Sequence, residues 1–233
     1  MIKYIHHTFS VFLLLLLMTV GSFTTPVNKT ASFTGAWQLQ EGSKEQVLII
    51  ADNYFMVSAY DKANKQFFYT YGGSYTITGS AMQTRIEFNT THKEQVGKTF
   101  KYVFDAAGHQ LSTDISGQKE IWKRLDDGSG PLCGNWRITD RMQGDKLVPM
   151  PLASRRTLKL LSGTRFQWAA INIETGEFFG TGGGTYTFAN GKYTENIAFF
   201  SRDSSRVGAL LSFDDKAEAD VWTHTGLSSR GDK

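Results

Sequence analysis

The sequence predicts an all-β protein of two tandem antiparallel up-and-down meander barrels, the second of which lacks its last strand. Three observations predict this fold. Bulky and polar residues alternate with a period of two, as in Arg165-Phe166-Gln167-Trp168, which indicates half-buried strands. Glycine is frequent, with 23 residues against 4 prolines, and turn signals recur at short intervals, as in all-β proteins. The unit Gly-x-Trp occurs twice, at Gly35-Ala36-Trp37 and at Gly134-Asn135-Trp136.

Residues 1–22 have the order of a secretory signal peptide. Lys3 and two histidines precede an apolar run from Val11 to Val20, and the small residues Gly21 and Ser22 follow it. The run is shorter than the roughly 20 apolar residues that a membrane-spanning helix needs. No cysteine follows it for lipid attachment. We therefore expect a secreted or periplasmic protein with no membrane span once the signal is removed.

Residues 31–126 are expected to form the first barrel, because eight short alternating segments lie between turn signals. Short connections favour a meander that closes on itself and so removes its exposed edges. The expected strands lie near 33–40, 45–51, 54–60, 67–78, 82–89, 98–104, 109–113 and 119–125.

Residues 132–233 repeat the unit. The two Gly-x-Trp units are offset by 99 (134 minus 35), and from Phe55 and Phe166 onward the offset is 111 (166 minus 55). The difference places an insertion within 141–151, which its two prolines predict to be a surface loop. The composition of residues 126–131 predicts a linker between the two copies.

Two further features distinguish the second copy. Asn190-Gly191 lies between aromatic segments and predicts a hairpin with a type I′ turn. The sequence after Gly226 holds no counterpart of the strand expected at 119–125. We therefore expect an open seam in the second barrel, which strand exchange or dimerisation can close.

The first copy resembles the lipocalin-like (calycin) barrels. The resemblance rests on Gly35-Ala36-Trp37 in the first strand, on the eight-strand meander and on Glu120-Ile121-Trp122-Lys123-Arg124 in the last strand. The Tyr-Thr and Gly-Gly-Gly-Thr-Tyr stretches also resemble those of uncharacterised secreted bacterial proteins of lipocalin-like type. The resemblance implies that Arg124 covers Trp37 as a structural cation–π contact. Gly35, Gly134 and Trp136 are assigned structural roles as well, although Trp136 has no matching arginine.

Several function classes find no support in the sequence. The net charge of +3 is spread over both copies, so we expect no nucleic-acid partner. Motifs for metal, phosphate or nucleophilic chemistry are missing, so no catalytic residue, metal or cofactor is assigned. The single cysteine, Cys133, reads as a small buried residue rather than a reactive thiol.

The candidate ligand site is the lumen of the second barrel. Strand parity places Tyr193, Glu195, Ile197 and Phe199 on one face of their strand. If the corresponding faces point inward, the lumen is mostly aromatic and holds one acid and one imidazole. The predicted ligand-binding residues are Phe166, Trp168, Tyr186, Tyr193, Glu195, Trp222 and His224. The alternative is a lumen filled by its own aromatic side chains, with Glu195 bonded to a tyrosine or facing water.

Three functions follow as hypotheses. The first is an exported, non-enzymatic binding protein for a small apolar or amphipathic molecule. The second is a secreted interaction or inhibitor module that binds a protein or glycan partner through its loops. The third is an enzyme that uses Glu195 and His224 as an acid–base pair; we rank it last, because nothing in the sequence fixes the distance between the two groups.

Overall fold

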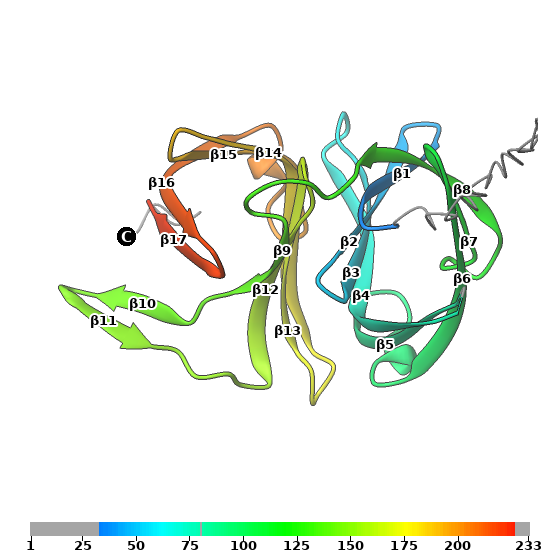
Figure 1. Cartoon of the computed structure of the whole chain (residues 1–233), viewed down its shortest axis with the longest axis horizontal. Helices are drawn as coiled ribbons and strands as arrows, with labels where there is room; N and C mark the ends of the chain where they lie inside the picture. Colours follow the sequence, from blue (N-terminus) through cyan, green and yellow to red (C-terminus); the bar gives the residue numbers. More distant parts are fainter. Residues whose placement is uncertain (1–32, 80, 227–233) are drawn as a thin grey trace, which may run out of the picture. The chain divides into compact units, whose positions relative to one another are not determined.

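The first copy closes into an eight-stranded antiparallel barrel, seen in Figure 1. The computed structural model describes residues 33–79 and 81–226, so the predicted signal peptide lies outside the described residues. The barrel strands are β1 (Gly35–Glu41), β2 (Lys44–Ala51), β3 (Tyr54–Asp61), β4 (Gln66–Thr78), β5 (Ala81–Asn89), β6 (Thr99–Ala107), β7 (Gln110–Thr113) and β8 (Glu120–Asp126). Each overlaps the predicted strand closely, which confirms the meander.

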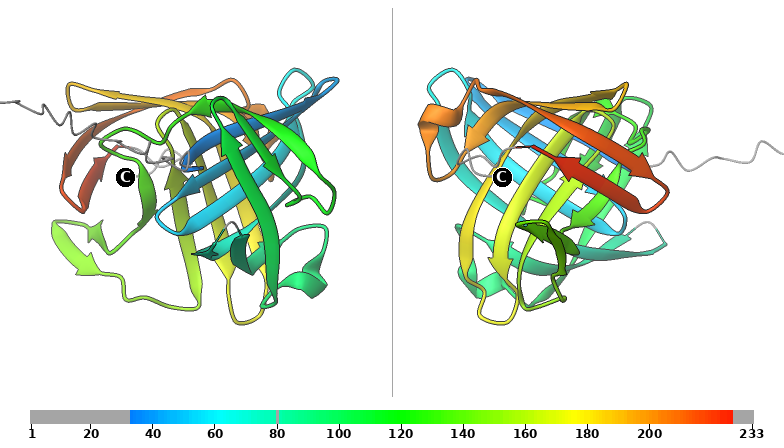
Figure 2. Two further views of the ribbon diagram at one scale, coloured as in Figure 1. Left: turned by 45° about the vertical axis from the view of Figure 1, so that its right-hand side comes forward. Right: turned by 90° about the vertical axis from the view of Figure 1, so that its left-hand side faces the viewer.

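The second copy forms a curled sheet that stays open. Within the described residues this sheet has seven strands, in the order β17-β16-β15-β14-β13-β12-β9, and β9 and β17 are its two free edges (Figure 2). The strands are β9 (Gly134–Arg137), β12 (Arg155–Leu161), β13 (Arg165–Asn172), β14 (Phe178–Ala189), β15 (Lys192–Phe200), β16 (Leu210–Glu218) and β17 (Val221–Thr225). The fold prediction of a complete barrel and an incomplete one is therefore confirmed. We call the second copy the half-barrel.

The two copies share the same internal irregularities. The register between β4 and β5 shifts at Gly72 and Gly73, where Glu87 of β5 is the extra residue of a bulge, and the matching shift at Gly183 and Gly184 leaves Ala198 of β15 as the extra residue. A Cβ atom on Gly73 would overlap the carbonyl oxygen of Arg85, so glycine is needed where the backbones approach this closely. The bulge also reverses the alternation in β15. Phe199 therefore packs outward against the first barrel, which corrects its predicted placement on the lumen face.

The insertion is a hairpin rather than the predicted loop. Strand β10 (Asp140–Gln143) pairs with β11 (Lys146–Pro149) as a separate two-stranded sheet, visible in Figure 1. Gly144 at the turn has a φ of +60°, a conformation that glycine adopts readily. Met142 and Leu147 are cross-strand partners and so share one face.

The barrel and the half-barrel are joined by an apolar cluster. Leu158, Leu160 and Ile171 of the half-barrel are buried in one cluster with Val47 and Met56 of the barrel. The Tyr60 and Phe199 rings stack across this contact with their centroids 4.8 Å apart, and Gln167 Nε2 donates to Thr70 Oγ1 at 2.8 Å. This cluster occupies the outer face of β12 and β13, and it leaves their inner face for the concave side of the half-barrel.

The two Gly-x-Trp units have the same local geometry but different neighbours. Trp37 Nε1 donates to the Phe33 carbonyl, and Trp136 Nε1 donates to the Leu132 carbonyl, both at 2.8 Å. Arg124 Cζ lies 3.9 Å from the Trp37 ring centroid, as the resemblance implies. Trp136 instead meets Trp222 of β17 edge to face, with ring centroids 5.5 Å apart. Among the described residues no helix is long and apolar enough to cross a membrane.

Candidate functional site

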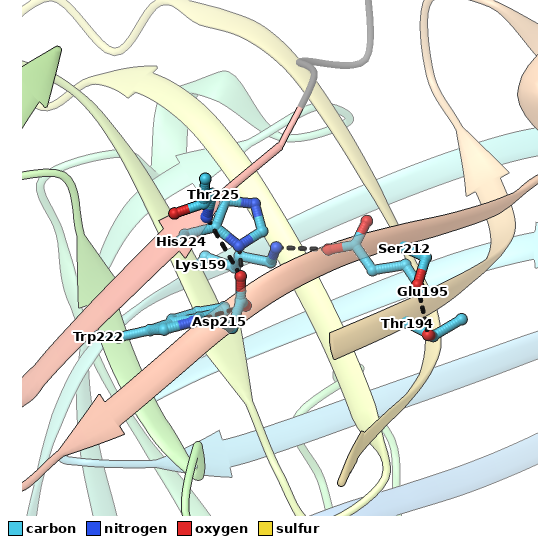
Figure 3. Close-up of polar contacts among 8 residues, drawn as sticks. All are labelled: Lys159, Thr194, Glu195, Ser212, Asp215, Trp222, His224 and Thr225. Carbon is cyan, nitrogen blue, oxygen red and sulfur yellow. Dashed lines mark hydrogen bonds and ion pairs between the residues drawn. The ribbon is translucent and has the colours of Figure 1, made fainter. Parts of the chain in front are cut away.

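An ion pair lies at the centre of the concave face of the half-barrel. Lys159 Nζ of β12 contacts Glu195 Oε1 of β15 (Figure 3). The two side chains are only 20% and 6% exposed, respectively. The attraction between the two charges therefore has to compensate for the hydration that each has lost on burial. Glu195 is therefore buried on the inner side of its strand, and its ion-pair partner is Lys159.

Three aromatic rings surround the Lys159 ammonium. Its Nζ lies 4.8 Å from the Tyr193 centroid, 5.1 Å from that of Trp222 and 5.3 Å from that of Phe166, within the range of cation–π attraction. Burial, helped by the charge of Glu195, raises the pKa of Tyr193 well above its usual value. This aromatic environment favours a positive charge beside Glu195.

A second buried carboxylate, Asp215 of β16, organises the free edge at β17. Its side chain is 0% exposed. It accepts hydrogen bonds from Trp222 Nε1 at 2.8 Å and from the Thr225 amide at 3.3 Å, and it contacts His224 Nδ1 at 2.9 Å. Because Asp215 occupies Nδ1, Nε2 is the His224 nitrogen that a ligand could reach. Figure 3 shows that Glu195 and His224 each have a different partner, so they do not form the acid–base pair considered from the sequence.

The structure brings the seven predicted ligand-binding residues onto one concave surface. Phe166, Tyr186 and Tyr193 belong to its buried cluster, against which Trp168 and Trp222 pack. The His224 ring lies 4.3 Å from that of Phe213. Most of these rings pack against one another and fill the space between them. Tyr186, for example, is buried and donates its hydroxyl to the Ser162 carbonyl at 2.6 Å. This end of the concave face is therefore a packed core.

A pocket of about 260 Å³ opens farther along the same face. Its floor includes Thr157 of β12 and Ala170 of β13, which lie two residues beyond Lys159 and Trp168 on the same sides of their strands. The two connections to the hairpin β10–β11 form its walls. The lining residues are Arg137, Ile138, Met150, Pro151, Leu152, Ala153, Arg155, Arg156, Thr157 and Ala170. The strands that form the floor are shared with the first copy, and the walls of the pocket come from the insertion and its connections.

In the closed barrel, large side chains occupy the region that corresponds to the pocket of the half-barrel. Subtracting 111 from Gly180 and Gly182 gives Tyr69 and Tyr71. These two tyrosines stack with their centroids 6.4 Å apart, and Tyr69 donates its hydroxyl to the buried Gln46 at 2.6 Å. Two large side chains of the first copy are thus glycines in the second. The rings of Trp168 and Phe200 take up part of the released space beside Gly182, and the pocket remains next to them.

The polar groups of the half-barrel also replace core residues of the first copy. By the same offset, Lys159 corresponds to Leu48, Glu195 to Thr84 and Asp215 to Phe104. All three first-copy residues are buried. The fold itself therefore does not require charges at these positions. Sequence reasoning missed Lys159 and Asp215, although this register marks both as places where one copy is apolar and the other charged.

Two other kinds of reactive site, a nucleophilic thiol and a metal site, find no support in the described residues. Burial raises the pKa of the Cys133 thiol to about 11, and the negative charge of Asp52 adds to this, so the thiol is protonated at neutral pH. The described residues contain no cluster of His, Cys, Asp or Glu that could hold a metal ion.

Comparison with known proteins identifies no relative. The chain matches no protein-family model, no curated protein and no solved structure. The resemblance to lipocalin-like barrels therefore stays a prediction, and the chemistry of the half-barrel is interpreted from its own residues.

Proposed function

We propose that this chain is an exported, non-enzymatic binding protein that holds a small, partly apolar molecule on the concave face of the half-barrel. The proposed site is the pocket at Thr157 and Ala170, with Trp168 and the Lys159–Glu195 pair at its inner end. Export rests on the signal-like sequence of residues 1–22.

The observation that supports this proposal most strongly is the difference between two copies of one unit. The first copy fills its interior with its own side chains, including Trp37, Phe55 and Trp122. The second copy replaces Tyr69 and Tyr71 with Gly180 and Gly182 and contains a pocket of about 260 Å³. A small concave site with apolar walls and a few polar groups is typical of ligand binding.

Binding can be tested with phenylnaphthylamine, an uncharged dye whose fluorescence rises in apolar surroundings. We expect the wild-type protein to bind it saturably and Ala170→Leu, which fills the pocket floor, to weaken binding about tenfold or more. Thr76→Leu is the control, because Thr76 lies at a shallow depression on the first barrel. Circular dichroism checks that each variant is folded. Failure of the wild-type protein to bind the dye, or equal binding by Ala170→Leu, would count against the proposal.

A second candidate function is an interaction module that uses the inserted hairpin. Met142 and Leu147 share one face of β10–β11 and are 55% and 64% exposed, an unusual display of apolar surface. The free edges of β9 and β17 also offer backbone groups for strand addition. Replacing Met142 and Leu147 with serine should abolish self-association in sedimentation velocity if a second copy is the partner. A wild-type protein that sediments as a monomer at every concentration would contradict self-association.

A further inference from the structure

We infer that the molecule held in the pocket carries an acidic group beside its apolar body, and that Arg137 and Arg155 bind this group. The inference rests on the proposed function and specifies the chemical class of ligand. A carboxylate, a sulfonate and a phosphate ester share the required chemistry, which is a compact anion with oxygen acceptors.

The charge of the pocket has one sign. Three arginines line it and no acidic residue does. A site of one sign of charge with low-dielectric walls attracts the opposite charge strongly. Cationic ligands are therefore disfavoured, and neutral ones gain no charge–charge attraction from the arginines.

The three arginines differ in what they already bind. Arg156 donates Nε–H to the Ala153 carbonyl at 3.1 Å. Its positive charge also stabilises the ionised form of Tyr54 in the first barrel, which partly offsets the effect of burial on the pKa of that tyrosine. Arg137 reaches the carbonyls of Ile138 and Met150 through Nη1, each at 3.4 Å. The Arg155 guanidinium lies 4.4 Å from the Phe179 ring centroid, a contact that uses its face and leaves its edge donors for an anion.

Arg137 and Arg155 form no salt bridge among the described residues. The ion pairs of the half-barrel use Lys159, Lys192, Arg206, Lys216 and His224. Each guanidinium has five N–H donors, and the contacts above use few of them. Two unpaired guanidinium groups at one pocket are suited to a charged acceptor that comes from outside the chain.

The remaining walls suit an apolar body. Ile138, Met150 and Leu152 line the same pocket and are 55%, 41% and 61% exposed. A ligand that covered them would remove apolar surface from water, which favours binding. A simple inorganic anion would leave these side chains uncovered. Arginines and apolar walls together therefore point to an amphipathic anion.

Two dyes with one ring system separate the inference from the proposed function. Anilinonaphthalene sulfonate carries the anion, and phenylnaphthylamine is its uncharged parent. We expect the sulfonate to bind the wild-type protein more tightly, and the double variant Arg137→Gln/Arg155→Gln to lose about tenfold or more in affinity for it. Affinity for the uncharged dye should change less than about twofold. The control is Arg141→Gln/Arg165→Gln, because Arg141 is exposed, Arg165 is half-buried and neither lines the pocket.

The outcomes are distinguishable. If neither dye binds, the proposed function fails and the inference fails with it. If both dyes bind and the double variant leaves the sulfonate affinity unchanged, only the inference is overturned. Displacement of the sulfonate dye by octanoate, octanesulfonate and octyl phosphate then ranks the acidic groups. Displacement by octanol at equal concentrations would contradict the requirement for an anion.

Discussion

At the scale of single residues, the half-barrel differs from the closed barrel mainly by charges placed in a shared framework. Lys159 and Glu195 occupy positions where the first copy has Leu48 and Thr84. A buried ion pair contributes little net stability, because desolvation of both groups offsets their attraction. The pair lies among the aromatic rings of the packed core and does not line the pocket, so the effect of removing it should be read out in stability.

We expect Lys159→Leu to destabilise the protein by about 3–5 kcal/mol, because it leaves the Glu195 carboxylate buried without a partner. The double variant Lys159→Leu/Glu195→Thr, which restores the first-copy residues, should recover most of this loss. Urea unfolding measured for both variants and for Glu195→Thr completes the cycle. A double variant as unstable as Lys159→Leu alone would show that the ion pair itself holds the half-barrel together.

At the scale of elements, the sequence predicts most strands because alternation and turn chemistry are local properties. The Asn190-Gly191 turn has the two positive φ angles, +53° and +73°, that a type I′ hairpin requires. The hairpin β10–β11 was missed, although Gly144-Asp145 between short alternating segments is itself a hairpin signal. Two prolines nearby favoured the interpretation as a loop.

The placement of Phe199 and the pairing of Glu195 depend on non-local geometry, and here the sequence was a poorer guide. Strict alternation put Phe199 in the lumen, but the bulge beside Gly183 and Gly184 reverses the face. Lys159 meets Glu195 across a curled sheet whose curvature no local pattern specifies. The shared inner face of Phe166, Tyr186 and Tyr193 was predictable because parity holds within each strand. The arginine pocket was not predictable, because its walls depend on how the inserted hairpin folds back.

At the scale of the whole molecule, Asp126 ties the barrel to the half-barrel. It ends β8, and its carboxylate accepts hydrogen bonds from the Ala36 amide of β1 at 3.2 Å and from Ser162, Gly163 and Thr164 of the β12–β13 turn at 2.7–3.0 Å. Burial acts to raise the pKa of Asp126, but these hydrogen bonds outweigh it and lower the pKa. The stretch predicted to be a linker therefore begins with a fixed junction.

We expect Asp126→Asn to destabilise the protein by about 1–3 kcal/mol at pH 7, because buried donors lose a charged acceptor. A lowered folded-state pKa means that the contribution is fully present above the unfolded value of about 3.9 and is lost as the pH falls through the folded value. The difference between wild type and variant should therefore shrink in the acid range. Urea unfolding at pH 7 and near pH 3 measures this, with exposed Asp105→Asn as the control. A difference independent of pH would contradict the assignment.

A crystal structure of the protein soaked with anilinonaphthalene sulfonate would show directly where an amphipathic anion binds. We expect density for the rings between Ala170, Leu152 and Met150, with the sulfonate within hydrogen-bonding distance of Arg137 and Arg155. Dye bound only on the hairpin face at Met142 and Leu147, or anywhere on the closed barrel, would contradict it.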